Sequence, residues 1–224
     1  MKFSIIIPVL NEEAVISSCL APLQHLRPEC EIIIADGGSV DSTLRLCRGL
    51  ADKIVASATG RGVQMNQGAL QAAGDVLIFL HADTVLPGNA LALIKQSLNE
   101  KRQWGRFDIR FTGQHFMFKV IARMMNWRSA LTGIATGDQV IFTYRQAFDL
   151  AGRYPEIKLM EDIALSRALK KISAPVCLTE KVTSSSRRWE HNGLFKTIVL
   201  MWLLRLLYFF GADADRLARL YNAD

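Results

Sequence analysis

The sequence lacks the short motifs that mark several large enzyme classes. No G-x-G-x-x-G follows the first predicted strand and no G-x-x-x-x-G-K-[ST] occurs, which disfavours dinucleotide oxidoreductases and P-loop nucleotidases. G-x-S-x-G and H-E-x-x-H are also absent, so neither an α/β-hydrolase nor a zinc protease is indicated. Candidate functional residues must therefore follow another pattern.

Cysteine is scarce and unpaired along the chain. The four cysteines are Cys19, Cys30, Cys47 and Cys177, and none forms a C-x-x-C pair. A zinc ribbon or a dithiol redox site is therefore not indicated. We expect reduced, mostly buried thiols, as in a cytoplasmic protein.

Long hydrophobic runs and a strong excess of one charge are missing too. The longest apolar run, 197–210, is interrupted by Arg205 and falls short of the about 20 residues that span a bilayer. The first residues show no signal-peptide pattern, which again predicts a cytoplasmic protein. A net charge of +6, from 27 basic and 21 acidic residues, is too mild to indicate nucleic-acid binding.

The positive charge is concentrated in one segment. Residues 101–128 contain seven basic residues and one acid. With the apolar segment 194–210, this segment suits contact with the inner face of an anionic membrane, where a lipid-linked acceptor would lie. The alternative is that the apolar helix packs on the core and the basic side chains are solvated.

Strands and helices alternate through the first hundred residues, which predicts βαβ units and a parallel sheet. We expect strands at 3–8, 31–35, 53–56 and 75–80, and helices at 11–24, 41–50, 61–73 and 86–99. Beyond residue 100 we expect strands at 104–112, 139–144 and 176–178, and helices at 115–131, 145–151, 160–171, 194–210 and 213–221. Without a repeat or a low-complexity linker, the whole chain 1–224 is expected to form one domain.

Acidic residues stand where strands of this sheet end, and ligands bind beyond the carboxyl ends of parallel strands. Asp36, followed by Gly37, suits a ribose or base, and the glycine lets the backbone approach the ligand; alternatively it forms an Asx-turn. Asp83 suits a hard divalent ion that bridges a diphosphate, or it caps a helix. Glu161 and Asp162 suit a general base for an acceptor hydroxyl, or complement a helix dipole.

Four segments together carry a resemblance to a known family: Ser4-Ile-Ile-Ile-Pro-Val-Leu-Asn-Glu-Glu, Ile34-Ala-Asp-Gly-Gly-Ser-Val-Asp-Ser-Thr, Gly74-Asp…Phe79-Leu-His-Ala-Asp and Glu161-Asp-Ile-Ala-Leu-Ser-Arg. In this order they resemble family 2 glycosyltransferases. The resemblance implies an α/β GT-A fold (the nucleotide-diphospho-sugar transferase fold), which is a Rossmann-like, mainly parallel sheet flanked by helices and followed by C-terminal helices. It implies inverting transfer from a nucleotide-diphosphate sugar, with a UDP-sugar expected, assisted by Mn²⁺ or Mg²⁺.

The resemblance also assigns roles to residues. Asp36 would contact the nucleoside, and Asp83 would bind the metal with the diphosphate. Asp162 would be the catalytic base, with Glu161 beside it. The remaining residues expected at the nucleotide-sugar site are Pro8, Asn11, Glu12, Gly37, Arg61 and Ala82. Residues 1–100 would form the nucleotide-binding half, 101–192 the acceptor half and 193–224 a C-terminal helical segment.

The sequence departs from the family's D-x-D motif, which here reads His81-Ala82-Asp83. His81 would either ligate the metal, since imidazole suits Mn²⁺ better than Mg²⁺, or contact the donor sugar. In the later loop 184–193, Arg188 would clamp phosphate, Trp189 would cover the sugar and His191 would complete the metal site; alternatively this is a surface loop.

Asp138 and Gln139 are expected at the acceptor; alternatively, Asp138 caps the following strand. A narrower resemblance links the chain to a short bacterial group associated with arsenosugar biosynthesis and radical-SAM proteins. It is carried by His81-Ala-Asp-Thr, Gly137-Asp-Gln and Trp202…Tyr208.

Two other functions stay open at this point. A nucleotidyltransferase would share the fold, but it usually has a basic, glycine-rich loop after the first strand. Here residues 9–13 stand at that place and include no basic residue. A degenerate, non-catalytic nucleotide-sugar-binding protein would explain the altered D-x-D motif, but not the presence of Asp36, Asp83 and Asp162.

Overall fold

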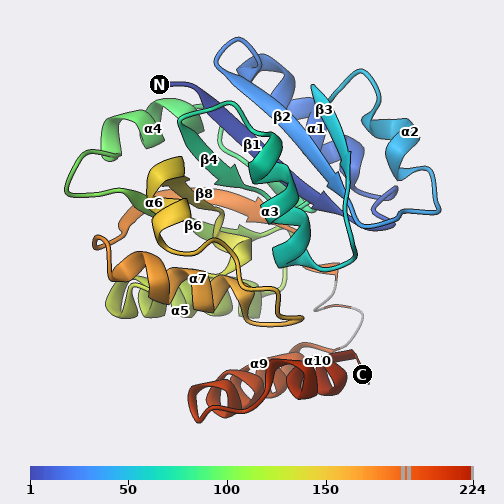
Figure 1. Cartoon of the computed structure of the whole chain (residues 1–224). Coiled ribbons are helices and arrows are strands. Elements are labelled where there is room, and N and C mark those ends of the chain that lie inside the picture. The colour runs from blue at the N-terminus through green and yellow to red at the C-terminus, as the bar shows by residue number, and fades with distance from the viewer. Residues whose placement is uncertain (188–189, 191–192, 223–224) are drawn as a thin grey trace.

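The computed structural model describes residues 1–187, 190 and 193–222, and its centre is one eight-stranded sheet (Figure 1). The strands are β1 (Phe3–Val9), β2 (Cys30–Asp36), β3 (Lys53–Ala56), β4 (Val76–Phe79), β5 (Thr84–Val85), β6 (Trp104–Phe111), β7 (Ile141–Tyr144) and β8 (Val176–Ser184). Their order is β3-β2-β1-β4-β7-β6-β8-β5. The first four strands are parallel, as predicted, whereas β7 is antiparallel to both its neighbours.

Helices cover both faces of the sheet, which confirms the predicted α/β class. They are α1 (Ile16–Leu23), α2 (Thr43–Cys47), α3 (Arg61–Gln71), α4 (Ala90–Ser97), α5 (Phe116–Thr132), α6 (Arg145–Leu150), α7 (Glu161–Lys170), α9 (Leu194–Phe209) and α10 (Ala214–Asn222). Two short 3₁₀ helices, η1 (Gln24–Leu26) and η2 (Gly137–Gln139), complete the described elements.

Alternation along β1 divides the core into two layers, because successive side chains of a strand point to opposite faces. Ile5 and Ile7 belong to the cluster that includes buried residues of α1, α4 and α5. Ile6 belongs to the cluster formed with α3, α6 and α7. The sheet is therefore buried on both faces, and its strand ends remain as the place for a ligand.

The first helix begins later than predicted. The sequence predicts a helix from Asn11, but α1 starts at Ile16. Asn11 has a left-handed backbone (φ 55°) and its Oδ1 accepts a hydrogen bond from Val40 N at 2.9 Å. Its own N–H donates to Ser39 Oγ at 3.0 Å. Asn11 thus joins two loops at the strand ends instead of capping a helix.

The sequence pattern predicts an apolar face of Met117, Val120, Ile121, Met124 and Leu131 on α5, but only Ile121 of these is buried. The buried residues are Phe118, Ile121, Ala122, Met125 and Ser129. The helix instead presents an apolar stripe to solvent, which consists of Phe116, Val120, Met124, Trp127 and Leu131. Sequence periodicity alone did not show which of two apolar sides packs against β6.

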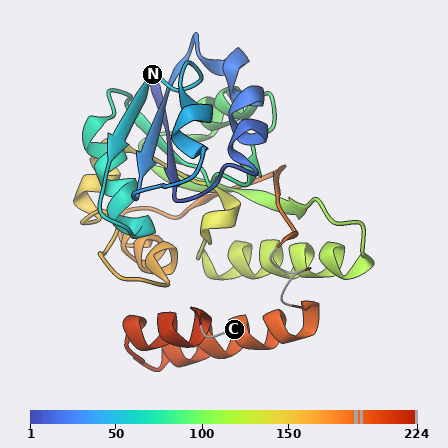
Figure 2. The same ribbon diagram turned by 90° about the vertical axis from the view of Figure 1, so that its right-hand side faces the viewer.

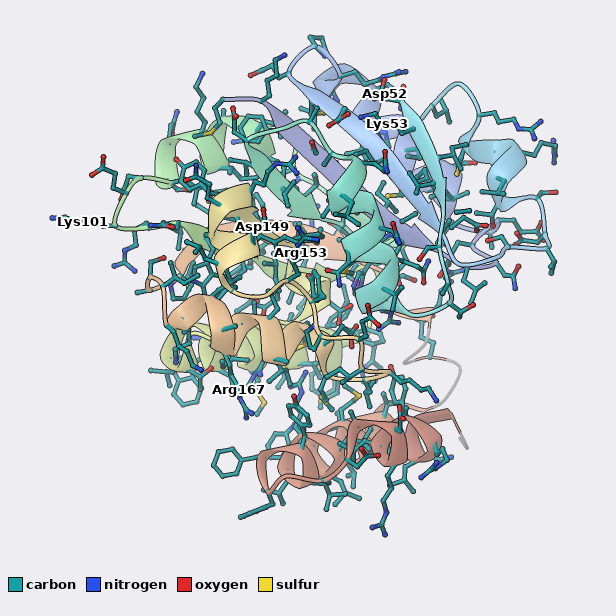
Figure 3. All side chains as sticks on the ribbon, in the orientation of Figure 1. Asp52, Lys53, Lys101, Asp149, Arg153 and Arg167 are labelled. Atoms are coloured by element: carbon teal, nitrogen blue, oxygen red, sulfur yellow. The ribbon has the colours of Figure 1, made fainter. Side chains whose placement is uncertain are left out.

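The C-terminal helices α9 and α10 pack against the body through a third, smaller cluster of buried residues (Figure 2). Leu204 and Leu217 meet Leu159, Met160 and Ile163, which lie before and at the start of α7. Figure 3 shows Arg167 reaching from α7 towards these helices, and its guanidinium lies 5.3 Å from the centre of the Tyr208 ring. Among the described residues, none of the helices has the length and hydropathy needed to span a bilayer.

Candidate active site

A cavity of about 440 Å³ opens where β1 and β4 end, and it is closed by η2, the start of α7 and the C-terminal helices. The structure brings nine of the predicted site residues to its wall: Pro8, Glu12, Arg61, His81, Ala82, Asp83, Asp138, Glu161 and Asp162. Asn11, Asp36, Gly37 and Gln139 do not line it. Arg188, Trp189 and His191 lie outside the described residues.

Asp36 ends β2 and is buried beside the cavity. Its carboxylate accepts hydrogen bonds from the backbone N–H groups of Gly38 (3.1 Å) and Ser39 (3.0 Å). This is the Asx-turn that the sequence offered as the alternative. It leaves Asp36 rigidly held at the strand end, where a nucleoside would lie in a sheet of this kind.

Gln64 of α3 ties the ends of β1 and β2 together, and sequence reasoning missed it. Its buried amide donates to Val9 O and Ala35 O, both at 2.8 Å. A side chain at Gly37 would meet Gln64 at 3.0 Å, so Gly37 must be small here. A buried glutamine on an otherwise apolar helix face was the available signal, because a buried amide needs partners.

His81, which follows β4, faces the loop that contains η2. Its Nδ1 lies 3.5 Å from Asp138 Oδ1. Burial works to lower the pKa of His81, but the hydrogen bond with Asp138 outweighs it and raises the pKa. A β-carbon at Gly137 would lie 2.3 Å from the imidazole Cε1, so the ring packs directly against a glycine backbone.

Glu161 begins α7 and is buried in the cavity wall. Burial, and then the neighbouring Asp162, raise its pKa to about 7, while Arg61 opposes this shift. At Arg61, shielding from water works to lower the pKa, but Glu161 and then Tyr221 outweigh it and raise the pKa. Arg61 therefore stays a full positive charge that faces carboxylates across the cavity.

Asp162 is held in place by backbone groups. Its Oδ2 accepts a hydrogen bond from Gly137 N at 2.8 Å. The preceding Met160 has a left-handed backbone (φ 69°), which turns the chain sharply into α7. A non-glycine residue in this region of φ is uncommon and is tolerated where packing enforces it. The turn directs both acids of the pair to the cavity.

The two predicted acceptor residues have different surroundings. Asp138 lines the cavity, and its side chain is 39% exposed. Gln139 is fully buried, and its Oε1 accepts a 3.3 Å hydrogen bond from Thr136 N in a capping box. Gln139 thus shapes η2, and Asp138 is the residue of the two that a ligand can reach.

His81 and Asp83, which follow β4, could hold a divalent ion only if the phosphate oxygens of a bound nucleotide complete its coordination shell. No group of three metal-binding side chains occurs among the residues that the structure describes. Asp83 and His81 both line the cavity, and His81 Nε2 is a buried nitrogen without a hydrogen-bond partner in the described part of the chain. Mg²⁺ and Mn²⁺ sites of this type use one or two protein ligands, with phosphate oxygens completing the shell.

The far wall of the cavity comes from the end of the chain, which sequence reasoning did not place here. Thr197, Met201 and Arg205 of α9 and Tyr221 of α10 line it. The interrupting Arg205 in an apolar helix was the available signal, since a charge within such a helix needs a polar environment.

A family model described as "Glycosyl transferase family 2" matches residues 4–150. A curated "PGL/p-HBAD biosynthesis glycosyltransferase" of Mycobacterium bovis is 40% identical over 94 residues. That match covers 38% of this chain and 36% of the relative, so the shared part is about a third of that protein.

Solved structures resemble the fold over most of the chain. S. aureus TarS 1-349, in complex with UDP-GlcNAc, has a TM-score of 0.65 at 20% identity, covering 83% of this chain and 58% of that one. Glucosyl-3-phosphoglycerate synthase of Mycobacterium tuberculosis, in complex with Mn²⁺, UDP and glucosyl-3-phosphoglycerate, has a TM-score of 0.61 at 16% identity, covering 82% and 70%. The predicted GT-A fold is thereby confirmed.

Proposed function

Because this chain belongs to glycosyl transferase family 2, we propose that it transfers a sugar from a nucleotide-diphosphate sugar, a UDP-sugar, to an acceptor hydroxyl with inversion. The observation that carries the proposal is one cavity that is lined both by Asp83, which follows β4, and by the Glu161–Asp162 pair of α7. A donor-side acid and an acceptor-side acid in the same cavity can act on one bound sugar.

The donor would lie over the ends of β1 and β2. Asp36 would bind the nucleoside, and Pro8 and Glu12 would form the pocket wall. Arg61 offers a positive charge in the cavity for the diphosphate. Residues 1–100 would thus form the nucleotide half and 101–192 the acceptor half, with the C-terminal segment 193–224 as the outer wall.

A divalent ion would be held by Asp83, with His81 Nε2 as a second available ligand. Burial, and then Asp83, raise the pKa of Glu12, so negative charge is crowded at this wall, which favours a cation. When bound, the ion supplies neutralisation of the charge that develops on the leaving diphosphate. The Mn²⁺ in a structural neighbour is consistent with this proposal.

Asp162 would accept the proton of the acceptor hydroxyl. The acceptor oxygen forms a bond to the anomeric carbon while the bond to the diphosphate oxygen breaks, and the nucleoside diphosphate leaves. The proton passes to the Asp162 carboxylate, which the Gly137 N–H orients. Such a single displacement from the opposite side inverts the configuration.

We propose in addition that α5 and α9 dock on an anionic bilayer. Both helices expose apolar stripes, and in both views α9 lies below α5 (Figures 1 and 2). Neither helix contains an acid, and Lys119 and Arg123 are exposed on α5. Apolar side chains flanked by cations match the interface of an anionic membrane. Membership of the arsenosugar-associated group stays a prediction.

Calorimetric titration with UDP and with GDP, each with and without Mn²⁺, tests the proposal. We expect metal-dependent binding of UDP that is lost in Asp36→Ala and Asp83→Ala. Asp149→Ala is the control, because the exposed Asp149 side chain pairs with the neighbouring Arg153 (Figure 3) and neither residue lines the cavity. If the folded protein binds neither nucleotide, the proposal is overturned, and a non-catalytic protein that kept only the fold replaces the enzyme.

A further inference from the structure

Two arginines, Arg205 in the cavity wall and Arg128 on α5, have no anionic partner among the residues that the structure describes. Nε and Nη2 of Arg128 (α5) and Nε of Arg205 (α9) are out of contact with solvent, and these atoms have no hydrogen-bond partner among the described residues. No carboxylate in the described part of the chain lies within 4.0 Å of either guanidinium. Arg106, by contrast, pairs with Asp108.

The two guanidinium groups repel each other. Burial, and then Arg205, lower the pKa of Arg128 to about 10. Both side chains are partly buried, and a cation that loses hydration without a partner is destabilised. An anion bound to both guanidinium groups would remove this cost.

The two arginines act on acids of the proposed acceptor side. The charged groups that act on Glu12, at the nucleotide wall, are Asp83, Arg187, Arg61 and His81. Arg128 instead interacts with Asp162, and Arg205 with Asp138. Arg205 also lines the cavity directly. Arg128 is thus an electrostatic neighbour of the proposed base, and Arg205 is one of the acceptor residue.

We infer that Arg128 and Arg205 form an anion subsite that binds a phosphate group of the acceptor, close to the hydroxyl that receives the sugar. This inference rests on the proposed function. A phosphate has enough oxygens to accept hydrogen bonds from two guanidinium groups, which form strong, charge-assisted bonds to it. It would replace the missing carboxylates and fix the acceptor hydroxyl near Asp162.

Inorganic phosphate is the first probe. Its binding is followed as the rise in the thermal unfolding midpoint at constant ionic strength, with and without saturating UDP and Mg²⁺. We expect binding that UDP does not displace and that falls at least about tenfold in Arg205→Gln and Arg128→Gln. Arg123→Gln on α5 and Arg219→Gln on α10, both exposed, should bind phosphate like the wild type.

If UDP displaces the bound phosphate, the arginines belong to the donor site and the inference is overturned. Phosphate affinity that is unchanged in Arg205→Gln also overturns it. Phosphate binding is also measured without UDP, so the result does not depend on nucleotide binding. Failure of the anion subsite can therefore be told apart from failure of the proposed function.

A matched set of acceptors identifies the source of the phosphate. We compare three acceptors that share a glycerol unit with a free hydroxyl: glycerol 3-phosphate, vesicles containing phosphatidylglycerol, and plain glycerol. Each is offered with labelled UDP-glucose and UDP-GlcNAc. Transfer to glycerol 3-phosphate indicates a soluble phosphate, and transfer to the vesicles indicates a lipid headgroup; either must fall in Arg205→Gln. Transfer to glycerol alone that Arg205→Gln leaves unchanged overturns the inference.

Discussion

The backbone N–H of Gly137 donates a 2.8 Å hydrogen bond to Oδ2 of Asp162, and the same glycine packs against the imidazole of His81. One residue of η2 therefore sets the positions of the proposed base and of the altered first residue of the D-x-D motif. Small displacements at such a point affect both walls of the cavity together.

Gly137→Ala should impair transfer more than folding. The new β-carbon would lie 2.3 Å from His81 Cε1, so either the imidazole or η2 must move. We expect transfer to fall by about 10²-fold, as for a misplacement near 1 Å, and the free energy of unfolding to fall by roughly 1–3 kcal/mol.

Urea unfolding and the rate of nucleotide release from the donor measure the two effects. Gly88→Ala is the matched control, because its β-carbon would lie 3.7 Å from His25, at ordinary contact distance. Wild-type activity in Gly137→Ala would show that His81 and Asp162 do not depend on this contact.

Asp162→Asn should stop the chemistry and spare donor binding. The amide oxygen can still accept the Gly137 hydrogen bond, but the side chain can no longer take a proton. A general base contributes about 10²–10⁴-fold, so we expect nucleotide release to fall by that factor while UDP affinity is unchanged. Asp149→Asn is the surface control, and a catalytically normal Asp162→Asn would remove Asp162 from the mechanism.

The parts of the site that lie at strand ends were predictable from sequence. Asp83 follows an apolar strand, the Glu161–Asp162 pair opens a helix, and all three line the cavity, because a parallel sheet brings its strand ends together. Asn11 was predicted to begin a helix but bridges two loops, because its left-handed backbone is not visible in a sequence.

The distant wall was not predictable in the same way. Arg205 and Tyr221 reach the cavity only because Leu204 and Leu217 pack against Leu159 and Met160. Such packing between helices and loops far apart in the chain leaves no periodic signal. Likewise, α5 has apolar residues on two sides, and only its contact with β6 decides which side is buried.

Arg128→Met should stabilise the ligand-free protein. Methionine keeps much of the apolar stem of arginine but removes a charge that has no partner among the described residues. Replacing uncompensated buried charges by apolar groups is often neutral or stabilising, and we expect a gain of about 1–3 kcal/mol in unfolding free energy. Urea unfolding at neutral pH measures it, with Arg123→Met as the exposed control on the same helix. A loss of stability confined to Arg128→Met would mean that Arg128 has a partner in solution.

Glu161→Gln should stabilise the apo protein increasingly as pH rises. The pKa of Glu161 is raised from 4.5 to about 7, so between these values the folded protein holds a proton that the unfolded chain has released. The contribution of Glu161 to stability is therefore complete below pH 4.5 and is lost as pH rises through about 7. Relative to the wild type, the unfolding free energy of the variant should rise by on the order of 2–3 kcal/mol from acidic to mildly alkaline pH. Urea unfolding across this range, without metal or nucleotide, tests the sign, and a gain that shrinks with rising pH would contradict the assignment.

Trp127→Glu and Trp202→Glu should weaken binding to phosphatidylglycerol vesicles. Trp127 of α5 is 67% exposed and Trp202 of α9 is 61% exposed, so neither change disturbs the core. Burying such a side chain in the interface contributes roughly 1.5–3 kcal/mol, and a glutamate adds repulsion from anionic lipid. We expect the affinity for vesicles, measured by sedimentation, to fall at least tenfold, which corresponds to about 1.4 kcal/mol.

The control for these two variants is Leu150→Glu, an exposed apolar residue (77%) of α6, and Figure 1 shows α6 away from α5 and α9. It should sediment with vesicles like the wild type. Binding should also weaken with salt, because Lys119 and Arg123 act through screened charges. Loss of binding in all three variants would indicate a general effect of added negative charge, and binding that none of them changes would exclude this surface as the membrane contact.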